Sequence, residues 1–391
     1  MRNTARLLLP ASLFLGALLP IPLPAQSDAS TEPSNLSLKL ETAQAMTRAL
    51  RWLEDQQEPA GNWSTPDHPA ITALVVRAML QSPAPPEVGR ENPTIGPALE
   101  FILSRVQPDG GIYTPDHGLA NYNTSISLMA LAAAGNPDHS EIIERARAFV
   151  IRGQQFFEPG SENERFSGGV GYGNSYSHSD MSNTMFALQS LAETRTLFPG
   201  SADEDAPELD WEAAVQFLSR CQNLEETNDT GLASDDPANR GGFYYFPGKS
   251  QAGEMELPDG RVALRSYGSI SYAGLLSYAY ADLEPEDPRV RGVIEWLEKN
   301  FTLEENPGMG QQGRFFYFMT MATALDVAGI EQLATPGDPD LDWREALVLQ
   351  LLDLQDASGF WVNTHGRWME KDPVLVTAYT LLALNRIHDD L

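Results

Sequence analysis

Gln57-Glu58-Pro59-Ala60-Gly61-Asn62-Trp63 and Gln355-Asp356-Ala357-Ser358-Gly359-Phe360-Trp361 are the two stretches that decide the fold. Both read Q-x3-G-x-W, and residues 107–113 are a near match that ends in Tyr. A Gln amide can satisfy free N–H groups at the start of the next helix. The Gly permits a tight turn, and the aromatic ring covers the junction between two helices. We therefore interpret these residues as structural.

The motif belongs to a longer unit that occurs six times. Each unit has an apolar helix ending near Gln, a Gly-aromatic loop, and a second helix rich in Ala, Leu, Ser and Thr. The first helices are predicted over residues 49–57, 98–106, 146–151, 211–218, 290–297 and 343–354. The second helices are predicted over 71–80, 125–134, 182–191, 269–280, 319–328 and 374–384. The first helix has one apolar stripe and should lie outside, whereas the second is apolar on most faces and should lie inside.

A single hairpin cannot bury both of its helices, so neighbouring units must complete the core. The last copy resembles the first closely and lacks the character of a polar cap. This favours a closed ring, with an open superhelix as the alternative.

The pattern resembles the QW repeat of the squalene cyclase, terpenoid cyclase and protein prenyltransferase superfamily, over most of residues 45–387. It is most similar to secreted bacterial members of that superfamily. The resemblance implies an all-α (α/α)6 toroid of six helical hairpins, with a central cavity lined by the inner helices. The length of the chain suits one such domain, which we expect over residues 45–391 after a linker over 26–44.

The N-terminus has the pattern of a signal peptide over residues 1–25. Arg2 and Arg6 precede an apolar run, and a small residue stands before an expected cut at Ala25–Gln26. We therefore expect an exported protein, periplasmic or extracellular, that is not integral to a membrane.

The composition is strongly acidic, with 26 Lys and Arg against 54 Asp and Glu. The net charge of −28 argues against nucleic-acid binding, because phosphate backbones would be repelled. The hydrophobic content of 42% argues against general disorder, and the 31 Gly and 28 Pro residues predict many loops.

The catalytic signatures of the superfamily are mostly missing. A protonation-driven cyclase keeps one carboxylic acid neutral in a D-x-D-D cluster, and here only Asp180 stands in that place. Asp180, with His178 and Tyr176, is the candidate for acid chemistry; its alternative role is an N-cap for the third inner helix. Cys221 lacks the D-x-C pattern of a prenyltransferase zinc site and is interpreted as a buried apolar residue. The sequence identifies no cofactor and no metal ligand set.

Polar and aromatic residues near the starts of inner helices are the candidate ligand contacts. His68, His117, His178 and His365 precede inner helices, whose starts should share one end of the toroid. Together they could bind a metal or move a proton; the alternative is a turn inherited with the repeat. The further candidates are Tyr244, Tyr267, Tyr272, Arg265, Tyr317 and Trp368.

Three hypotheses for function remain open. The first is a toroid that binds an apolar or ring-shaped ligand, such as an isoprenoid, in its cavity. The second is a terpenoid cyclase-like enzyme of the squalene-hopene type with a degenerate acid motif. The third is a scaffold protein of the cell envelope. The sequence names neither the ligand nor the oligomeric state.

Overall fold

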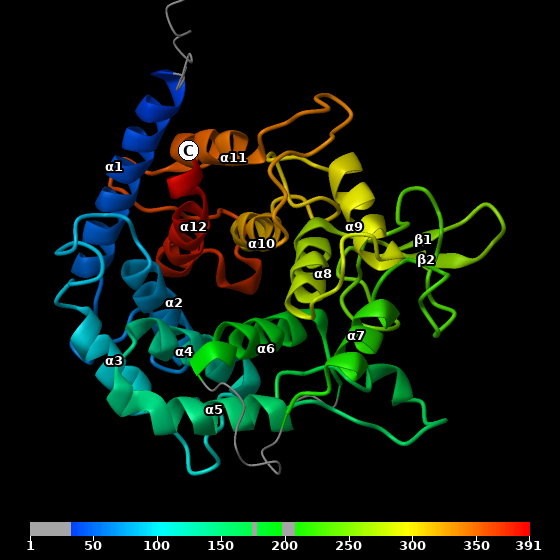
Figure 1. The fold of residues 1–391 in the computed structure, drawn as a ribbon, viewed down its shortest axis with the longest axis horizontal. Helices are drawn as coiled ribbons and strands as arrows, with labels where there is room; N and C mark the ends of the chain where they lie inside the picture. Colours follow the sequence, from blue (N-terminus) through cyan, green and yellow to red (C-terminus); the bar gives the residue numbers. More distant parts are fainter. Residues whose placement is uncertain (1–32, 174–177, 198–207) are drawn as a thin grey trace, which may run out of the picture.

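The computed structural model describes residues 33–173, 178–197 and 208–391, in which helices of an outer and an inner ring alternate along the chain (Figure 1). The outer helices are α1 (Pro33–Asp55), α3 (Ile95–Leu103), α5 (Ser140–Arg152), α7 (Trp211–Arg220), α9 (Pro288–Lys299) and α11 (Trp343–Leu354). The inner helices are α2 (Pro69–Leu80), α4 (Ala120–Ala134), α6 (Met181–Glu193), α8 (Gly268–Tyr280), α10 (Arg314–Val327) and α12 (Pro373–Ile387). The predicted all-α (α/α)6 toroid of six hairpins is confirmed.

The remaining regular structure is short. Residues inserted in the fourth repeat form an antiparallel pair, β1 (Glu254–Glu256) and β2 (Val262–Leu264), which projects from the rim in Figure 1. The 3₁₀ turns are η1 (Pro137–His139), η2 (Glu164–Phe166), η3 (Arg195–Leu197), η4 (Arg367–Met369) and η5 (His388–Asp390). The predicted signal peptide over residues 1–25 lies outside the described residues.

The ring is closed. Each inner helix packs against the inner helices before and after it, and α12 packs against both α2 and α1. α1 also contacts α11, so the last repeat completes the core of the first. The closed ring predicted from the likeness of the two terminal copies is therefore correct, and the open superhelix is excluded.

The first helix is longer than the sequence predicts. α1 begins at Pro33, so residues 33–44, expected to belong to a linker, are helical. Leu38, Thr42 and Ala45 are buried and stand at helical spacing. They extend the apolar stripe of the first outer helix toward the N-terminus, and this burial against the core is what keeps the segment helical.

The aromatic residue of the motif seals the junction in the first and last repeats, as predicted, whereas Ile112 and not Tyr113 takes the equivalent position in the second repeat. Trp361 is fully buried, and its indole N–H donates to the Leu351 carbonyl at 2.7 Å. Its backbone N–H donates to the Thr377 hydroxyl on the inner helix at 3.0 Å. Trp63 makes the equivalent bonds in the first repeat. The hydroxyl residues of the inner helices thus hold the loop against the hairpin.

The Gln side chain joins neighbouring repeats, but mainly as a donor. Gln355 Nε2 donates to the Gly359 carbonyl at 2.8 Å and to the Ala45 carbonyl at 2.9 Å. Gln57 makes the same pair of bonds to its own turn and to the residue before α3. The prediction that the amide accepts from free N–H groups is wrong for these two repeats. An NH₂ group with two donors can bond one carbonyl on each side of a repeat boundary.

Three repeats depart from the predicted pattern. In the second repeat Gln107 Nε2 donates to the carbonyls of Arg105 and Tyr113, both within its own repeat. In the third repeat the bridging residue is Gln154 and not Gln155; its Nε2 donates to the carbonyls of Gly168 and Asp210. In the fifth repeat residues 314–317, expected in a Gly-aromatic loop, form the first turn of α10. Gly313, with φ +66°, stands just before that turn as the N-cap. An aromatic run can occupy either setting, and here the burial of its rings selects the helix.

The C-terminal ends of the inner helices are joined by an ion-pair network. Arg77 of α2 is 5% exposed, and its Nη2 donates to both carboxylate oxygens of Glu193 of α6, at 2.6 and 2.7 Å. Arg386 of α12 lies 3.5 Å from Glu193 and 3.2 Å from Asp326 of α10. The Tyr280 hydroxyl of α8 donates to Glu193 at 3.4 Å. We call these five residues the axial network; they pin five of the six inner helices at one end.

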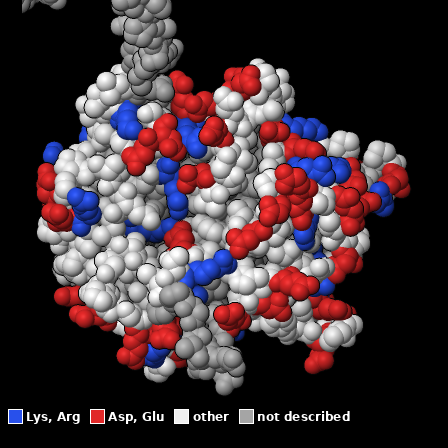
Figure 2. Space-filling model, in the orientation of Figure 1, with Lys and Arg blue, Asp and Glu red and all other residues white. Residues whose placement is uncertain are grey.

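Charged residues elsewhere lie mainly on the outer surface. Figure 2 shows acidic side chains scattered around one face of the molecule, with fewer basic ones, several of them toward its centre. No helix within the described ranges has the length and hydropathy that a membrane span requires.

Candidate functional site

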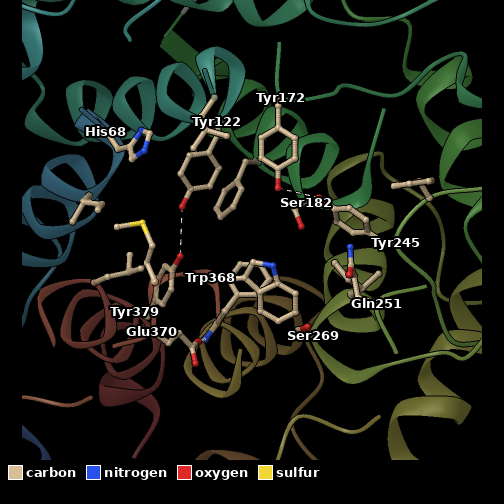
Figure 3. Close-up of a pocket in the computed structure, with 18 of the residues that line it drawn as sticks. His68, Tyr122, Tyr172, Ser182, Tyr245, Gln251, Ser269, Trp368, Glu370 and Tyr379 are labelled. Carbon is tan, nitrogen blue, oxygen red and sulfur yellow. Dashed lines mark hydrogen bonds between the residues drawn. The ribbon is translucent and has the colours of Figure 1, made fainter. Parts of the chain in front are cut away.

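A cavity of about 530 Å³ lies at the N-terminal ends of the inner helices. Its walls come from the starts of all six inner helices and from the loops that precede them. Figure 3 shows aromatic side chains from opposite walls pointing toward one another across this space. Its lining residues are His68, Ile71, Leu119, Tyr122, Tyr172, His178, Ser182, Phe186, Tyr245, Phe246, Gln251, Tyr267, Ser269, Ile270, Phe316, Trp368, Met369, Glu370, Leu375 and Tyr379. The volume is within the range of small-molecule sites, about 300–1,000 Å³.

Four aromatic residues form a closed belt in this cavity, which we call the aromatic belt. Tyr122 of α4 packs edge-on against Phe186 of α6, with ring centroids 5.3 Å apart. Phe186 lies 6.2 Å from Phe316 of α10, and Phe316 lies 5.9 Å from Tyr379 of α12. The hydroxyls of Tyr379 and Tyr122 share a hydrogen bond of 3.4 Å, which closes the belt (Figure 3). Four inner helices thus present ring faces and edges to one point near the axis.

Asp180 is a fully buried carboxyl beside the cavity. It caps α6, as predicted: its side chain accepts from the Asn183 backbone N–H at 3.0 Å and from Asn183 Nδ2 at 2.8 Å. Burial raises the pKa of Asp180 from 3.8 to about 6, against the opposing effect of its hydrogen bonds. One of those bonds comes from Tyr245, whose hydroxyl also pairs with that of Tyr172 at 3.0 Å. Asp180 does not line the cavity itself, but both tyrosines do.

Glu370 is the second buried carboxyl, and it does line the cavity. It is 1% exposed, and Oε1 accepts from the Phe316 backbone N–H at 2.8 Å. Oε2 accepts from Asn363 Nδ2 at 2.6 Å. Burial raises the pKa of Glu370 from 4.5 to about 6, although these hydrogen bonds favour the charged form. The sequence analysis missed this residue.

The residues just before Glu370 are held in an unusual backbone conformation. Trp368 and Met369 have φ of +55° and +64°, a region that costs roughly 1–2 kcal/mol for a residue with a side chain. Both line the cavity, and both remain about two-fifths exposed, at 43% and 42%. Strain of this kind persists where the surrounding structure fixes it, and it gathers at ligand sites. Arg367, stacked 4.4 Å from the Trp368 ring, fixes this segment through hydrogen bonds to Gln251 and Gln312.

Four of the residues singled out from the sequence line the cavity: His68, His178, Tyr267 and Trp368. His178 stacks on Phe246 with centroids 4.4 Å apart. The pKa of His68 is lowered chiefly by burial, and its Nδ1 has no hydrogen-bond partner among the described residues. Tyr176 lies outside the described residues.

The other predicted contacts lie away from the cavity walls. Tyr244 and Tyr317 are fully buried between helices, and their hydroxyls donate to the carbonyls of Arg220 and Thr302. Tyr272 packs against Tyr317, with centroids 5.6 Å apart. These tyrosines fill the space between the two rings of helices. The remaining three, Arg265, His117 and His365, are exposed.

The four histidines do not form one cluster. His68 and His178 reach the cavity, His117 pairs instead with Asp67 at 3.4 Å, and His365 contacts Thr364. Across residues 33–173, 178–197 and 208–391, no three His, Cys, Asp or Glu side chains are grouped so that they could hold a metal ion. Cys221 is buried, and burial raises the pKa of its thiol well above the ordinary value.

The sequence analysis missed all four residues of the aromatic belt, although a signal for some of them exists. Ser182 and Phe186 on α6, like Leu375 and Tyr379 on α12, stand four residues apart within the first two turns. Residues at this spacing share one face of a helix. Residues at this spacing, counted from the start of each inner helix, could have identified the helix face that points toward the axis.

Comparisons with known proteins find similar folds among solved structures but no match by sequence. No protein-family model matches the chain, and no curated protein matches it. One similar solved structure is a variant of the type II terpene cyclase MstE from Scytonema in complex with its substrate, geranylgeranyl dihydroxybenzoate. It is 14% identical, with a TM-score of 0.55, over 91% of this chain and 99% of that one. MstE without ligand aligns with 15% identity and a TM-score of 0.55, over 90% and 99% of the two chains.

A glycoside hydrolase of family 76 from a bovine strain of Bacteroides thetaiotaomicron is also similar. It is 12% identical, with a TM-score of 0.52, over 88% of this chain and 77% of that one. Identities this low establish a common fold. The resemblance to the terpenoid cyclase superfamily is thus confirmed at the level of architecture: the chain has the α/α toroid fold found in the type II terpene cyclase MstE and in a family 76 glycoside hydrolase.

Proposed function

We propose that this protein binds an apolar molecule of terpenoid size in the cavity at the N-terminal ends of its inner helices. The observation that carries the proposal is the cavity wall: most of its surface is aromatic or aliphatic carbon, although Tyr, His and Ser side chains also contribute polar groups. Burial of apolar surface supplies about 25 cal/mol per Å², so a ligand enclosed by this wall gains most of its affinity from hydrophobic contact.

The comparisons support the same ligand class. MstE has the same fold, and its substrate carries a geranylgeranyl chain. The glycoside hydrolase shares the fold, but sugars need many polar partners for their hydroxyl groups. The belt of Tyr122, Phe186, Phe316 and Tyr379 offers ring faces and few such partners. An isoprenoid suits this wall better than a sugar does.

Filling the cavity should weaken ligand binding. Ser182, half-buried at the start of α6, lines the cavity, so Ser182→Trp places an indole in the ligand's space. We expect the affinity for geranylgeraniol, measured by native mass spectrometry, to fall at least about tenfold, because the wall area available to the ligand is lost.

The matched control is Ser161→Trp, which adds the same side chain at an exposed loop position. Its affinity for geranylgeraniol should equal that of the unaltered protein. If geranylgeraniol fails to bind the unaltered protein, or if Ser182→Trp binds it undiminished, the proposed function is wrong.

A second candidate function is acid-initiated cyclisation of the bound molecule, favoured by Asp180. A buried carboxyl with a pKa near 6 keeps its proton at a higher pH than an ordinary Asp does, and can donate that proton most readily below about pH 6. The Asp180 proton is relayed through the Tyr245 and Tyr172 hydroxyls, each of which accepts one proton and gives up another, to an alkene carbon of the ligand. Ring closure then moves the positive charge along the chain. Loss of a proton from a neighbouring carbon then neutralises the carbocation and forms a new alkene. The hydroxyls of Tyr245 and Tyr172 connect Asp180 to the cavity.

Asp180→Asn tests this candidate while keeping the helix cap, since Asn caps helices as well as Asp does. Asn183 Oδ1 has no partner among the described residues, so turning the Asn183 amide over supplies an acceptor for the new NH₂ group. We expect release of cyclic product from polyprene substrates to fall by about a hundredfold or more, with geranylgeraniol binding retained. In the unaltered protein the rate should fall as pH rises above about 6, because the donor must be protonated. Unchanged turnover in Asp180→Asn would exclude this role.

A further inference from the structure

Glu370 is the single Asp, Glu, Lys or Arg among the lining residues described above. Its two oxygens are held by the Phe316 backbone N–H and by Asn363 Nδ2, which fixes the carboxylate in the wall. Neither donor carries a formal charge, and Glu370 forms no ion pair with a side chain of the described ranges. The Arg314 guanidinium, on the same helix start, donates instead to Leu303 and Gln311. The Arg314 charge is near enough to interact with Glu370, but no cationic side chain of the described residues contacts the carboxylate at ion-pair distance.

The aromatic belt adjoins this carboxylate. Glu370 bonds to the backbone of Phe316, a member of the belt, and its charge is close enough to Tyr379 to raise the pKa of that phenol further, beyond the larger effect of burial. The Trp368 ring comes from the same loop, two residues earlier in the chain. A cation placed over ring faces is attracted by the negative potential of the rings, and the attraction grows when water is excluded. A carboxylate beside several ring faces is therefore a site for a cation with apolar substituents.

We propose that the cavity recognises a ligand with a positively charged amine or ammonium group, held between Glu370 and the aromatic belt, with its apolar part in the rest of the cavity. This proposal rests on the proposed function, because the apolar part is what the remaining wall binds. It narrows the ligand class from apolar molecules to cationic amphiphiles. The acidic surface of the protein favours the approach of such a ligand.

Three probes that share a decyl chain separate charge from hydrophobic contact: decyltrimethylammonium, decanol and decanoate. Binding is measured by isothermal titration below the concentration at which micelles form. About 0.5 M NaCl shortens the Debye length to about 4 Å and suppresses attraction to surface charges. We expect the ammonium to bind about tenfold more tightly than decanol, and decanoate to bind most weakly.

Two variants test which residues cause the preference for decyltrimethylammonium over decanol, and a third variant serves as the control. Glu370→Gln removes the charge, and Tyr379→Leu removes one ring of the belt while leaving the carboxylate. Each should bring the affinities for decyltrimethylammonium and decanol to within about threefold of each other. Glu158→Gln removes a carboxylate at an exposed loop position away from the cavity and should leave the tenfold preference unchanged.

The outcomes distinguish this inference from the function on which it rests. Equal binding of the ammonium and decanol by the unaltered protein, or a full preference retained in both Glu370→Gln and Tyr379→Leu, overturns the cation site and leaves the apolar cavity standing. Binding of none of the three probes overturns both.

Discussion

Gly241→Ala should lower the free energy of unfolding by about 4 kcal/mol, the largest effect we expect from adding one methyl group. Gly241 has φ +90°, and a Cβ there would lie 1.9 Å from the carbonyl oxygen of Gly292 on α9. The backbone strain contributes about 1–2 kcal/mol. Displacing the α9 backbone contributes about 2–3 kcal/mol more, as overpacking does elsewhere. Chemical denaturation followed by circular dichroism measures the change.

Gly231→Ala is the matched control for the strain alone. Gly231 has φ +68°, and no atom lies within 4 Å of its would-be Cβ. Gly231→Ala should lower the free energy of unfolding by only about 1 kcal/mol. Equal losses in the two variants would contradict the idea that the motif glycine exists to let the next outer helix approach. The same close approach recurs at Gly61, Gly110, Gly168 and Gly359, all with φ between +89° and +100°.

Glu193→Gln should lower the free energy of unfolding by about 2–3 kcal/mol, because it breaks the axial network. The substitution keeps the shape of the side chain but leaves the buried Arg77 without its anionic partner and Arg386 with only Asp326. Removing one member of a buried pair typically costs about 3–5 kcal/mol, and the partial exposure of Glu193, 24%, reduces this figure. Thermal unfolding at neutral pH measures the loss.

The control for this prediction is an exposed pair. Arg195 and Asp282 lie 3.2 Å apart, with side chains 51% and 78% exposed. Asp282→Asn should change stability by less than about 0.5 kcal/mol, since solvent already screens the pair. If Glu193→Gln is as mild as Asp282→Asn, the network contributes little and the inner helices are held by their apolar contacts alone.

The fold was predictable because its signals are local and repeated. The bounds of α11, Trp343–Leu354, were predicted to the residue, since the flanking Asp342 and Gln355 are clear cap and turn signals. The start of α4 was placed at residue 125, five residues too late, because Leu119 caps it in a left-handed conformation that no sequence signal marks. The error had a consequence: Tyr122, a belt residue, was left outside the predicted helix.

The candidate site was less predictable because inner helices are buried on both faces. A helix that is apolar on every side has no distinct inward face in its sequence pattern, so the pattern does not identify the residues that face the axis. On α10 the neighbours Phe316 and Tyr317 differ in this respect: the first lines the cavity and the second lies between the rings of helices. Glu370 escaped notice because a Glu in a loop before a helix is usually solvated, and only the folded ring buries it.

The two ends of the ring of inner helices differ in their side chains. At the C-terminal ends the axial network fixes the helices to one another. At the N-terminal ends aromatic side chains and the carboxyl of Glu370 surround the cavity, and Asp180 is buried beside it. The contacts that join the inner helices at their C-terminal ends therefore do not occupy the space at their N-terminal ends. That space is the cavity on which the proposed function rests.

Photo-crosslinking tests the central claim, an apolar ligand in this cavity, most directly. A geranylgeranyl alcohol with a diazirine at its end is irradiated with the protein, and the labelled residues are identified by peptide mass spectrometry. We predict labels on α4, α6 and α12, at or beside Tyr122, Phe186 and Leu375, and their loss when geranylgeraniol competes or when Ser182 is replaced by Trp. Labels confined to exposed apolar residues such as Phe156 and Leu349, unaffected by competitor, would contradict the claim.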